Sequence, residues 1–223
     1  MYKIETHLHT KPVSACAHFE PEEMIRFYHN AGYKTVFISD HFSKYHFDKL
    51  GELSWEQKVG LMYNSFLRAK AEGEKFGMNV LFSPEFSLKE NHYLLYNVDL
   101  AFLNVRDDYF SMTLEEFCHY ARQWGVTIIQ AHPFRDGVCT PQPEYVDGFE
   151  VINGNLRHKN FDEKAFEVAE KYKLLRSAGS DAHKTEDIAT TAVVSPYEIK
   201  TTAEYLTLLK SGKAQLMKHG EIV

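Results

Sequence analysis

The sequence predicts an α/β fold, arranged as one barrel of about seven strand–helix units. Short apolar segments rich in β-branched residues alternate with amphipathic helical segments along almost the whole chain, a pattern typical of parallel β/α units. The chain has 223 residues, a length that suits one domain of the larger kind. Because no internal repeat or linker interrupts the pattern, we expect residues 1–223 to form a single barrel domain, somewhat smaller than the usual eight-unit version.

The expected strands are short, and most are apolar enough to be buried. In chain order they are residues 2–7, 34–40, 79–88, 98–105, 126–132, 146–153, 174–181 and 190–195.

The expected helices carry recognisable start and stop signals. Pro21 suits a first helical turn and Gly32 suits a helix end. Thr113 and Glu116 have the three-residue spacing of a capping box. In chain order the expected helices are residues 20–33, 54–77, 113–125, 160–173 and about 201–211.

Charge and cysteine content exclude several classes of protein. The formal net charge is −6, and no basic stripe is present, so we do not expect duplex nucleic acid as a partner. A small phosphorylated substrate stays possible, because a metal ion can supply positive charge. The N-terminus has no basic segment followed by an apolar core, and no apolar run is long enough for a membrane span. The three cysteines, Cys16, Cys118 and Cys139, are far apart and predict reduced thiols in a cytoplasmic protein.

The ends of the expected strands carry side chains that bind metal ions. In chain order these residues are His7, His9, Asp40, His41, Glu85, His132, Asp181 and His183, and His92 follows Glu85 by seven residues. Residues two apart on a strand point to the same side, so His7 and His9 can converge on one ion. In a β/α barrel the carboxyl ends of all strands meet on one face, where active sites lie.

Gathering so many imidazoles and carboxylates in one place is costly without cations, because carboxylates repel and imidazoles lose hydration. Imidazole and carboxylate ligands suit zinc, manganese or iron, and their number fits two or three divalent ions. The residues alone therefore predict a metal-dependent hydrolase site at the mouth of a barrel, with the substrate open.

Six short motifs resemble, in the same order, those of the PHP (polymerase and histidinol phosphatase) superfamily. They are "THLHT" at 6–10, "ISDH" at 38–41, "SPEFSL" at 83–88, "AHPF" at 131–134, "FEVINGN" at 149–155 and "GSDAH" at 179–183. The resemblance spans nearly the whole chain. It implies a distorted, TIM-like (β/α)7 barrel with two or three metal ions that hydrolyses phosphoesters. Members include histidinol phosphatases, nucleotide phosphoesterases, phosphotyrosine phosphatases and polymerase proofreading domains.

The resemblance also implies which residues hold each ion. The first ion would be bound by His7, His9, Glu85 and Asp181, the second by His41 and His183, and the third by His92 and His132 with Glu85 as a bridge. Many relatives place an aspartate or histidine five or six residues after the second histidine of the first motif. Ser14 and Ala15 occupy those positions here, and the nearest possible ligands are Cys16 and His18.

Two further residues are candidates for catalysis. Asp40, adjacent to His41, is expected to orient a ligand imidazole. Arg135 follows a ligand histidine and could clamp a phosphate by two hydrogen bonds, although a plain surface arginine fits the sequence equally well. Arg157 and Lys184 have the same status. The remaining histidines, including His46 and His158, lie in helical or polar stretches and carry no ligand signal.

These observations favour hydrolysis of a phosphomonoester or a small phosphodiester, with a histidinol-phosphate-like compound or a nucleotide among the possible substrates. Two alternatives stay open. One is an amidohydrolase-like enzyme that cleaves C–N bonds, although no lysine at a strand end suggests a carbamylated bridge. The other is a non-catalytic regulatory barrel whose site has decayed.

Overall fold

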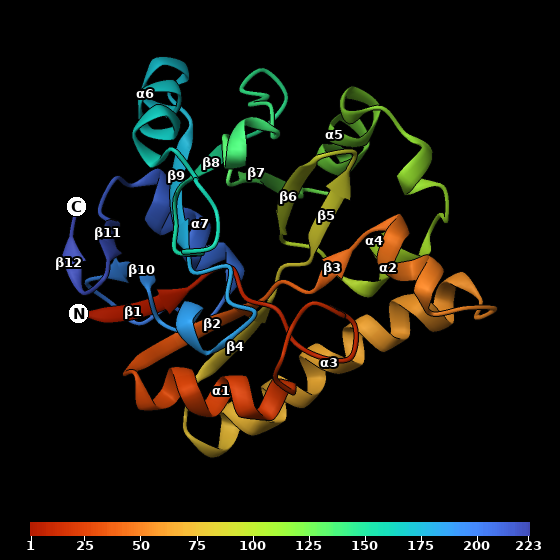
Figure 1. Ribbon diagram of the computed structural model, residues 1–223, viewed down its shortest axis with the longest axis horizontal. Coiled ribbons are helices and arrows are strands. Elements are labelled where there is room, and N and C mark those ends of the chain that lie inside the picture. The colour runs from red at the N-terminus through yellow and green to blue at the C-terminus, as the bar shows by residue number, and fades with distance from the viewer.

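The computed structural model describes residues 1–223 and contains two β-sheets with helices packed around them (Figure 1). The strands are β1 (Tyr2–Glu5), β2 (Tyr33–Ile38), β3 (His41–Phe42), β4 (Asn79–Phe82), β5 (Glu85–Leu88), β6 (Asn91–Tyr96), β7 (Thr127–Ala131), β8 (Gly148–Asn153), β9 (Leu175–Gly179), β10 (Thr191–Ser195), β11 (Gln215–Lys218) and β12 (Glu221–Ile222). The first sheet has the order β12-β11-β10-β1-β2-β4, and the second has the order β3-β5-β6-β7-β8-β9.

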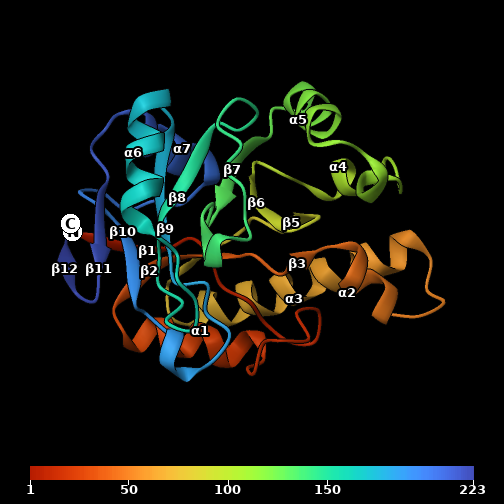
Figure 2. The ribbon, with the colours of Figure 1, turned by 45° about the horizontal axis from the view of Figure 1, so that its top comes forward.

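Seven α-helices accompany the sheets. They are α1 (Pro21–Asn30), α2 (Lys44–Lys49), α3 (Trp55–Lys75), α4 (Leu100–Asn104), α5 (Leu114–Gln123), α6 (Asp162–Tyr172) and α7 (Thr202–Lys210). Helices α1 and α3 lie together beneath the first sheet, whereas α6 lies against β8 and β9 on the other side of the molecule (Figure 2). No helix combines the length and apolarity that a membrane span requires.

Two strands of the first sheet continue along the chain into strands of the second sheet. Strand β2 leads into β3 through Ser39 and Asp40, and β4 leads into β5 through Ser83 and Pro84. The backbone N–H of Ser83 donates to the carbonyl oxygen of Ile38 at 3.0 Å, so the segment that joins β2 to β3 stays paired with the segment that joins β4 to β5. The carboxyl ends of these strands therefore reach the region where the sheets meet.

The α/β class predicted from the sequence is confirmed, but the hydrogen-bonded strands do not close into the expected (β/α)7 barrel. The free edge of β1 pairs with β10 in antiparallel register. Strand β9 therefore does not pair with β1. The segment after β9 meets the segment after β1 through the isolated parallel bridge of Leu8 and Ala182. The second departure from parallel β/α units is β6, which is antiparallel to both β5 and β7.

Most expected elements are present, and one is wrong. The segment 98–105 is not a strand: it contains α4, whose N-cap Asp99 accepts a hydrogen bond from the backbone N–H of Phe102 at 2.8 Å. Its two buried apolar residues, Phe102 and Leu103, suit a short helix as well as a strand. The strand in this part of the chain is instead β6, which forms a hairpin with β5 and carries His92.

Candidate metal centre

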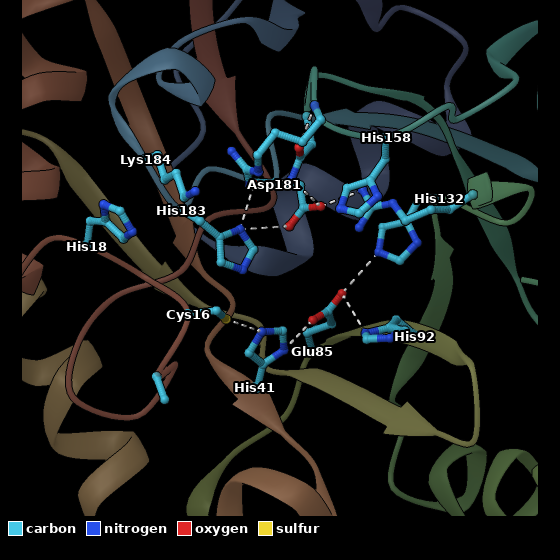
Figure 3. A pocket seen from close by; sticks show the side chains of 14 residues that line it. Cys16, His18, His41, Glu85, His92, His132, His158, Asp181, His183 and Lys184 are labelled. Atoms are coloured by element: carbon cyan, nitrogen blue, oxygen red, sulfur yellow. Dashed lines mark hydrogen bonds and ion pairs between the residues drawn. The ribbon is translucent and has the colours of Figure 1, made fainter. Parts of the chain in front are cut away.

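A polar pocket of about 470 Å³ opens where the two sheets meet (Figure 3). We call it the histidine pocket. It is lined by Ala15, Cys16, His18, His41, Glu85, His92, His132, Arg135, Asn155, Arg157, His158, Asp181, His183 and Lys184. All eight expected metal ligands lie in its wall or directly behind it, because each comes from the end of a strand or from the β5–β6 hairpin.

Glu85, the first residue of β5, lies at the centre of the cluster. Its carboxylate oxygens lie 3.2 Å from Nε2 of His7, 2.6 Å from Nδ1 of His41, 3.2 Å from Nδ1 of His92 and 3.4 Å from Nε2 of His132. These four imidazoles come from the loop after β1 and from β3, β6 and the end of β7. Figure 3 shows His41, His92 and His132 arranged around this carboxylate.

Asp181, just beyond β9, forms the second anionic centre. Its Oδ1 lies 3.4 Å from Nε2 of His7, 3.2 Å from Nε2 of His9 and 3.4 Å from Nδ1 of His183. Its Oδ2 accepts a hydrogen bond from Nη2 of Arg135 at 2.5 Å. Asp181 has a φ of 51°, in the left-handed region that costs a non-glycine residue energy. Backbone strain of this kind is concentrated at functional sites.

Mutual electrostatics set the charge states of these groups. Burial alone would raise the pKa of Glu85, but the imidazoles of His92, His7 and His41 lower that pKa well below its usual range. Burial and the guanidinium of Arg135 lower the pKa of His132 to about 3. For this pair the result is the ionised Glu85 carboxylate beside the neutral His132 imidazole, the state in which each of these two groups binds a metal ion. Burial opposes protonation of His41, but the carboxylate of Glu85 and the sulfur of Cys16 raise its pKa to about 10.

Two orphaned atoms indicate that the cluster fits a cation. Nδ1 of His41 and Oε2 of Glu85 lie only 2.6 Å apart, yet neither makes a hydrogen bond of acceptable geometry, and both are buried. Nε2 of His7 lies 3.1 Å from Nε2 of His9. Two donors each about 2.1 Å from one tetrahedral ion lie about 3.4 Å apart, so the spacing of the His7 and His9 nitrogens suits shared ligation.

Glu150, in β8, supports the cluster from behind and was not among the residues predicted from the sequence. Its Oε1 lies 2.9 Å from Nδ1 of His7. Its Oε2 accepts hydrogen bonds from the backbone N–H of His132 at 3.0 Å and from Nδ2 of Asn153 at 2.8 Å. An acidic residue in the middle of a fully buried strand was the signal that could have identified it, because an unpaired buried carboxylate is costly.

Asp40 lies behind the pocket and does not line it. Its carboxylate accepts hydrogen bonds from the backbone N–H of Thr10 at 2.6 Å, from Oγ1 of Thr10 at 2.7 Å and from Oγ of Ser14 at 2.8 Å. Oγ of Ser14 also lies 3.4 Å from Nδ1 of His9. Asp40 therefore reaches a candidate ligand only through Ser14, a geometry that suits orientation of an imidazole and not proton transfer in the pocket.

Three cationic side chains also line the pocket: those of Arg135, Arg157 and Lys184. Arg135 is held by Asp181, Asn153 and Asn160, so its Nη1 is the nitrogen left for another partner. Arg157 forms a two-atom contact with Asp187, from Nη1 to both carboxylate oxygens at 2.6 and 2.5 Å.

Cys16 and His46 lie beside His41. Sγ of Cys16 is 3.2 Å from Nε2 of His41, and the ring of His46 stacks on the ring of His41 with 4.3 Å between centroids. Burial opposes ionisation of Cys16, but hydrogen bonds from His183, His41 and His46 lower its pKa to about 4. His46 carried no ligand signal in the sequence, since α2 was not expected there.

Fold and site together define an α/β protein whose strand ends gather imidazoles and carboxylates in a pattern that suits divalent cations. A family model described as PHP-associated matches residues 160–214 of the chain. No curated protein sequence matches the chain significantly.

Three solved structures have similar folds. A two-domain protein from Bacteroides vulgatus, containing a predicted PHP-like metal-dependent phosphoesterase, has 15% identity and a TM-score of 0.71 over 99% of this chain and 66% of that one. PsfC from Pseudomonas syringae has 18% identity and a TM-score of 0.68 over 92% and 88%. An amidohydrolase from Chromobacterium violaceum has 15% identity and a TM-score of 0.61 over 98% of each chain. This chain thus spans about two thirds of the two-domain protein.

These comparisons support the resemblance to the PHP superfamily that the six motifs indicated, because a PHP-associated model matches part of the chain and the fold is similar to that of a protein named as PHP-like.

Proposed function

We propose that this chain is a metal-dependent phosphoesterase that acts on small phosphorylated substrates, with phosphomonoesters as the first class to test. The observation that carries the proposal is the position of Glu85, whose buried carboxylate lies within 3.7 Å of five imidazoles in an open pocket. One of the fold relatives supports the reaction class, since its name includes a predicted PHP-like metal-dependent phosphoesterase.

The proposed ligands bind two or three divalent ions, with zinc, manganese and iron as the candidates. They are His7, His9, His41, Glu85, His92, His132, Asp181 and His183. When bound, such ions would neutralise phosphoryl oxygens and make water a better nucleophile at neutral pH.

The outer wall of the pocket supplies the groups that would recognise the phosphate. Nη1 of Arg135 and the ammonium of Lys184 would place positive charge beside the nonbridging oxygens. His158, whose Nδ1 lies 2.6 Å from Asp136, would give a proton to the leaving oxygen. A pocket of about 470 Å³ suits a small substrate.

A phosphate-release screen tests the proposal. The purified chain with added Mn²⁺ or Zn²⁺ should release phosphate from at least one of four classes: amino-alcohol phosphates, nucleotides, sugar phosphates and phosphotyrosine peptides. Asp181→Asn should lower kcat/KM by at least about 1,000-fold, since it removes a charge shared by several ligands. Asp107→Asn, at an exposed position, is the matched control and should have no effect. Full activity in metal-stripped Asp181→Asn would refute the proposal.

C–N bond cleavage is the second candidate, because one fold relative is named an amidohydrolase. In this chain two carboxylates, Glu85 and Asp181, occupy the positions between the imidazoles. Measuring ammonia and phosphate release over the same compounds separates the two reactions. Absence of bound metal in the purified chain, together with no turnover, would instead favour a regulatory module.

A further inference from the structure

The loop between β1 and α1 carries Cys16 to the edge of the histidine pocket. Two backbone hydrogen bonds hold this loop in place. The N–H of Lys11 donates to the carbonyl oxygen of Phe19 at 2.9 Å, and the N–H of His18 donates to the carbonyl oxygen of His183 at 2.8 Å. The second bond ties the loop to the segment after β9, so the thiol stands at a fixed place against the wall formed by His183.

Three potential ligand atoms converge at this edge. Sγ of Cys16, one ring nitrogen of His41 and one ring nitrogen of His46 all lie within 4.8 Å of one another. Oγ of Ser43 lies 2.8 Å from Nδ1 of His46, which leaves Nε2 of His46 as the nitrogen available to a cation. Because His46 stacks on His41 with an interplanar angle of 18°, the two rings present their edges side by side.

We propose that Cys16, His41 and His46 bind a divalent cation through one thiolate sulfur and two imidazole nitrogens. Thiolate and imidazole ligands favour zinc, cobalt or cadmium over manganese, which prefers oxygen. The sulfur binds as the thiolate, any proton displaced from the imidazole nitrogens passes to solvent, and no oxidant is needed. The inference rests on the proposed function, because His41 is a proposed ligand in both. It deepens that function by naming the class of metal that this side of the pocket selects.

Cobalt titration tests the sulfur ligand directly. Metal-free chain titrated with Co²⁺ should develop a near-ultraviolet charge-transfer absorption, which appears only when a thiolate sulfur is bonded to cobalt. Cys16→Ser should lose this absorption. The matched control is Cys139→Ser, whose sulfur lies 3.9 Å from Nδ1 of His132 on a different wall, and it should keep the absorption. Cys16 is exposed, so the serine leaves no buried cavity, and far-ultraviolet circular dichroism checks the fold.

The contribution of His46 is measured in the same titration. His46→Ala should raise the Kd for the cobalt that produces the absorption by at least about 10-fold. His119→Ala, on the exposed face of α5, should leave this Kd unchanged. An unchanged Kd in His46→Ala would remove His46 from the site. A charge-transfer band that persists in Cys16→Ser, or cobalt binding to the wild-type chain with no such band, would overturn the inference.

This readout does not depend on turnover, so the two proposals can fail separately. A chain that shows the cobalt–thiolate band but releases no phosphate from any compound supports the cation site and refutes the phosphoesterase. A chain that releases phosphate but binds cobalt without the band supports the phosphoesterase and refutes thiolate ligation.

Discussion

Nδ1 of His7 lies 2.9 Å from Oε1 of Glu150, and both side chains are fully buried. A carboxylate can only accept this hydrogen bond, so Nδ1 of His7 carries a proton, and Nε2 is the nitrogen that faces Glu85 and Asp181. Burial opposes protonation of His7, but the carboxylates of Glu150, Asp181 and Glu85 raise its pKa well above its usual value. A bound cation would replace the second proton that these carboxylates attract.

Glu150→Gln should weaken metal binding by about 10- to 100-fold, because groups behind the ligands orient them. The amide keeps one acceptor oxygen but puts N–H donors where Oε2 accepts from His132 and Asn153. The Kd for zinc, measured by competition with a chromophoric chelator, checks this. Glu163→Gln, on the exposed face of α6, is the control and should bind as the wild-type chain does. Equal affinities would show that Glu150 does not position His7.

The close approach of β9 to the first motif leads to a second prediction. A Cβ added at Gly179 would overlap Cβ of His7 and Oε1 of Glu150. Gly179→Ala should therefore destabilise the chain by about 1–3 kcal/mol, typical of overpacking, and weaken metal binding as His7 is displaced. Gly60, inside α3, has nothing within 4 Å of such a Cβ. Gly60→Ala should stabilise the chain by about 0.5–1 kcal/mol. Denaturant unfolding measures both, and a neutral Gly179→Ala would contradict the packing argument.

Metal removal should lower stability, because a cation that binds only the folded chain stabilises it by mass action. At a free zinc concentration 100 times Kd the gain is about 2.7 kcal/mol. Thermal unfolding in chelator and in zinc should therefore give clearly different Tm values, with the zinc form higher. Asp181→Asn should lose most of this difference, whereas Asp107→Asn should keep it. Identical melting curves of the wild-type chain with and without zinc would argue against a buried metal centre.

The candidate ligands could be predicted because their positions follow from local rules. His7 and His9 are two residues apart, and Asp181 follows an apolar strand, so strand alternation and strand ends were enough to bring them together. Glu150 was missed because the strand around it is uniformly buried, and alternation gives no indication of which of its residues faces the pocket. His46 was missed because it belongs to α2, a helix of one and a half turns that is capped by Ser43 and carries little periodic signal.

The course of the sheets was harder to predict, because it depends on pairing between distant segments. Whether β1 pairs with β9 or β10 is decided by strands at least 170 residues away from it, and no local pattern encodes that choice. Likewise, the apolar run at 98–105 fits a strand or a short helix by length alone. Only the cap formed by Asp99 settles it, and the hairpin of β5 and β6 takes the strand position that this run was expected to fill.

The pairing of α1 with α3 gives a prediction for pH. Oε1 of Glu72 accepts from Nε of Arg26 at 2.6 Å, and its Oε2 accepts from Nζ of Lys75 at 2.6 Å. The hydrogen bonds from Lys75 and Arg26 lower the pKa of Glu72 in the folded chain. A lowered folded-state pKa means that the stabilisation is present above the unfolded pKa and is lost as the pH falls through the folded one.

Glu72→Gln should therefore lower Tm at pH 7, and the difference from the wild-type chain should shrink as the pH is lowered toward 3. Glu74→Gln, at an exposed position of the same helix, is the control. It makes the same change of side chain and charge as Glu72→Gln but breaks no contact with Arg26 or Lys75, so its Tm difference from the wild-type chain should not depend on pH in this way. Thermal unfolding of the three proteins between pH 3 and pH 7, all in chelator so that metal binding does not contribute, measures the effect. A Tm difference that stays constant over this range would mean that loss of packing, and not loss of the ion pair, explains the effect of Glu72→Gln.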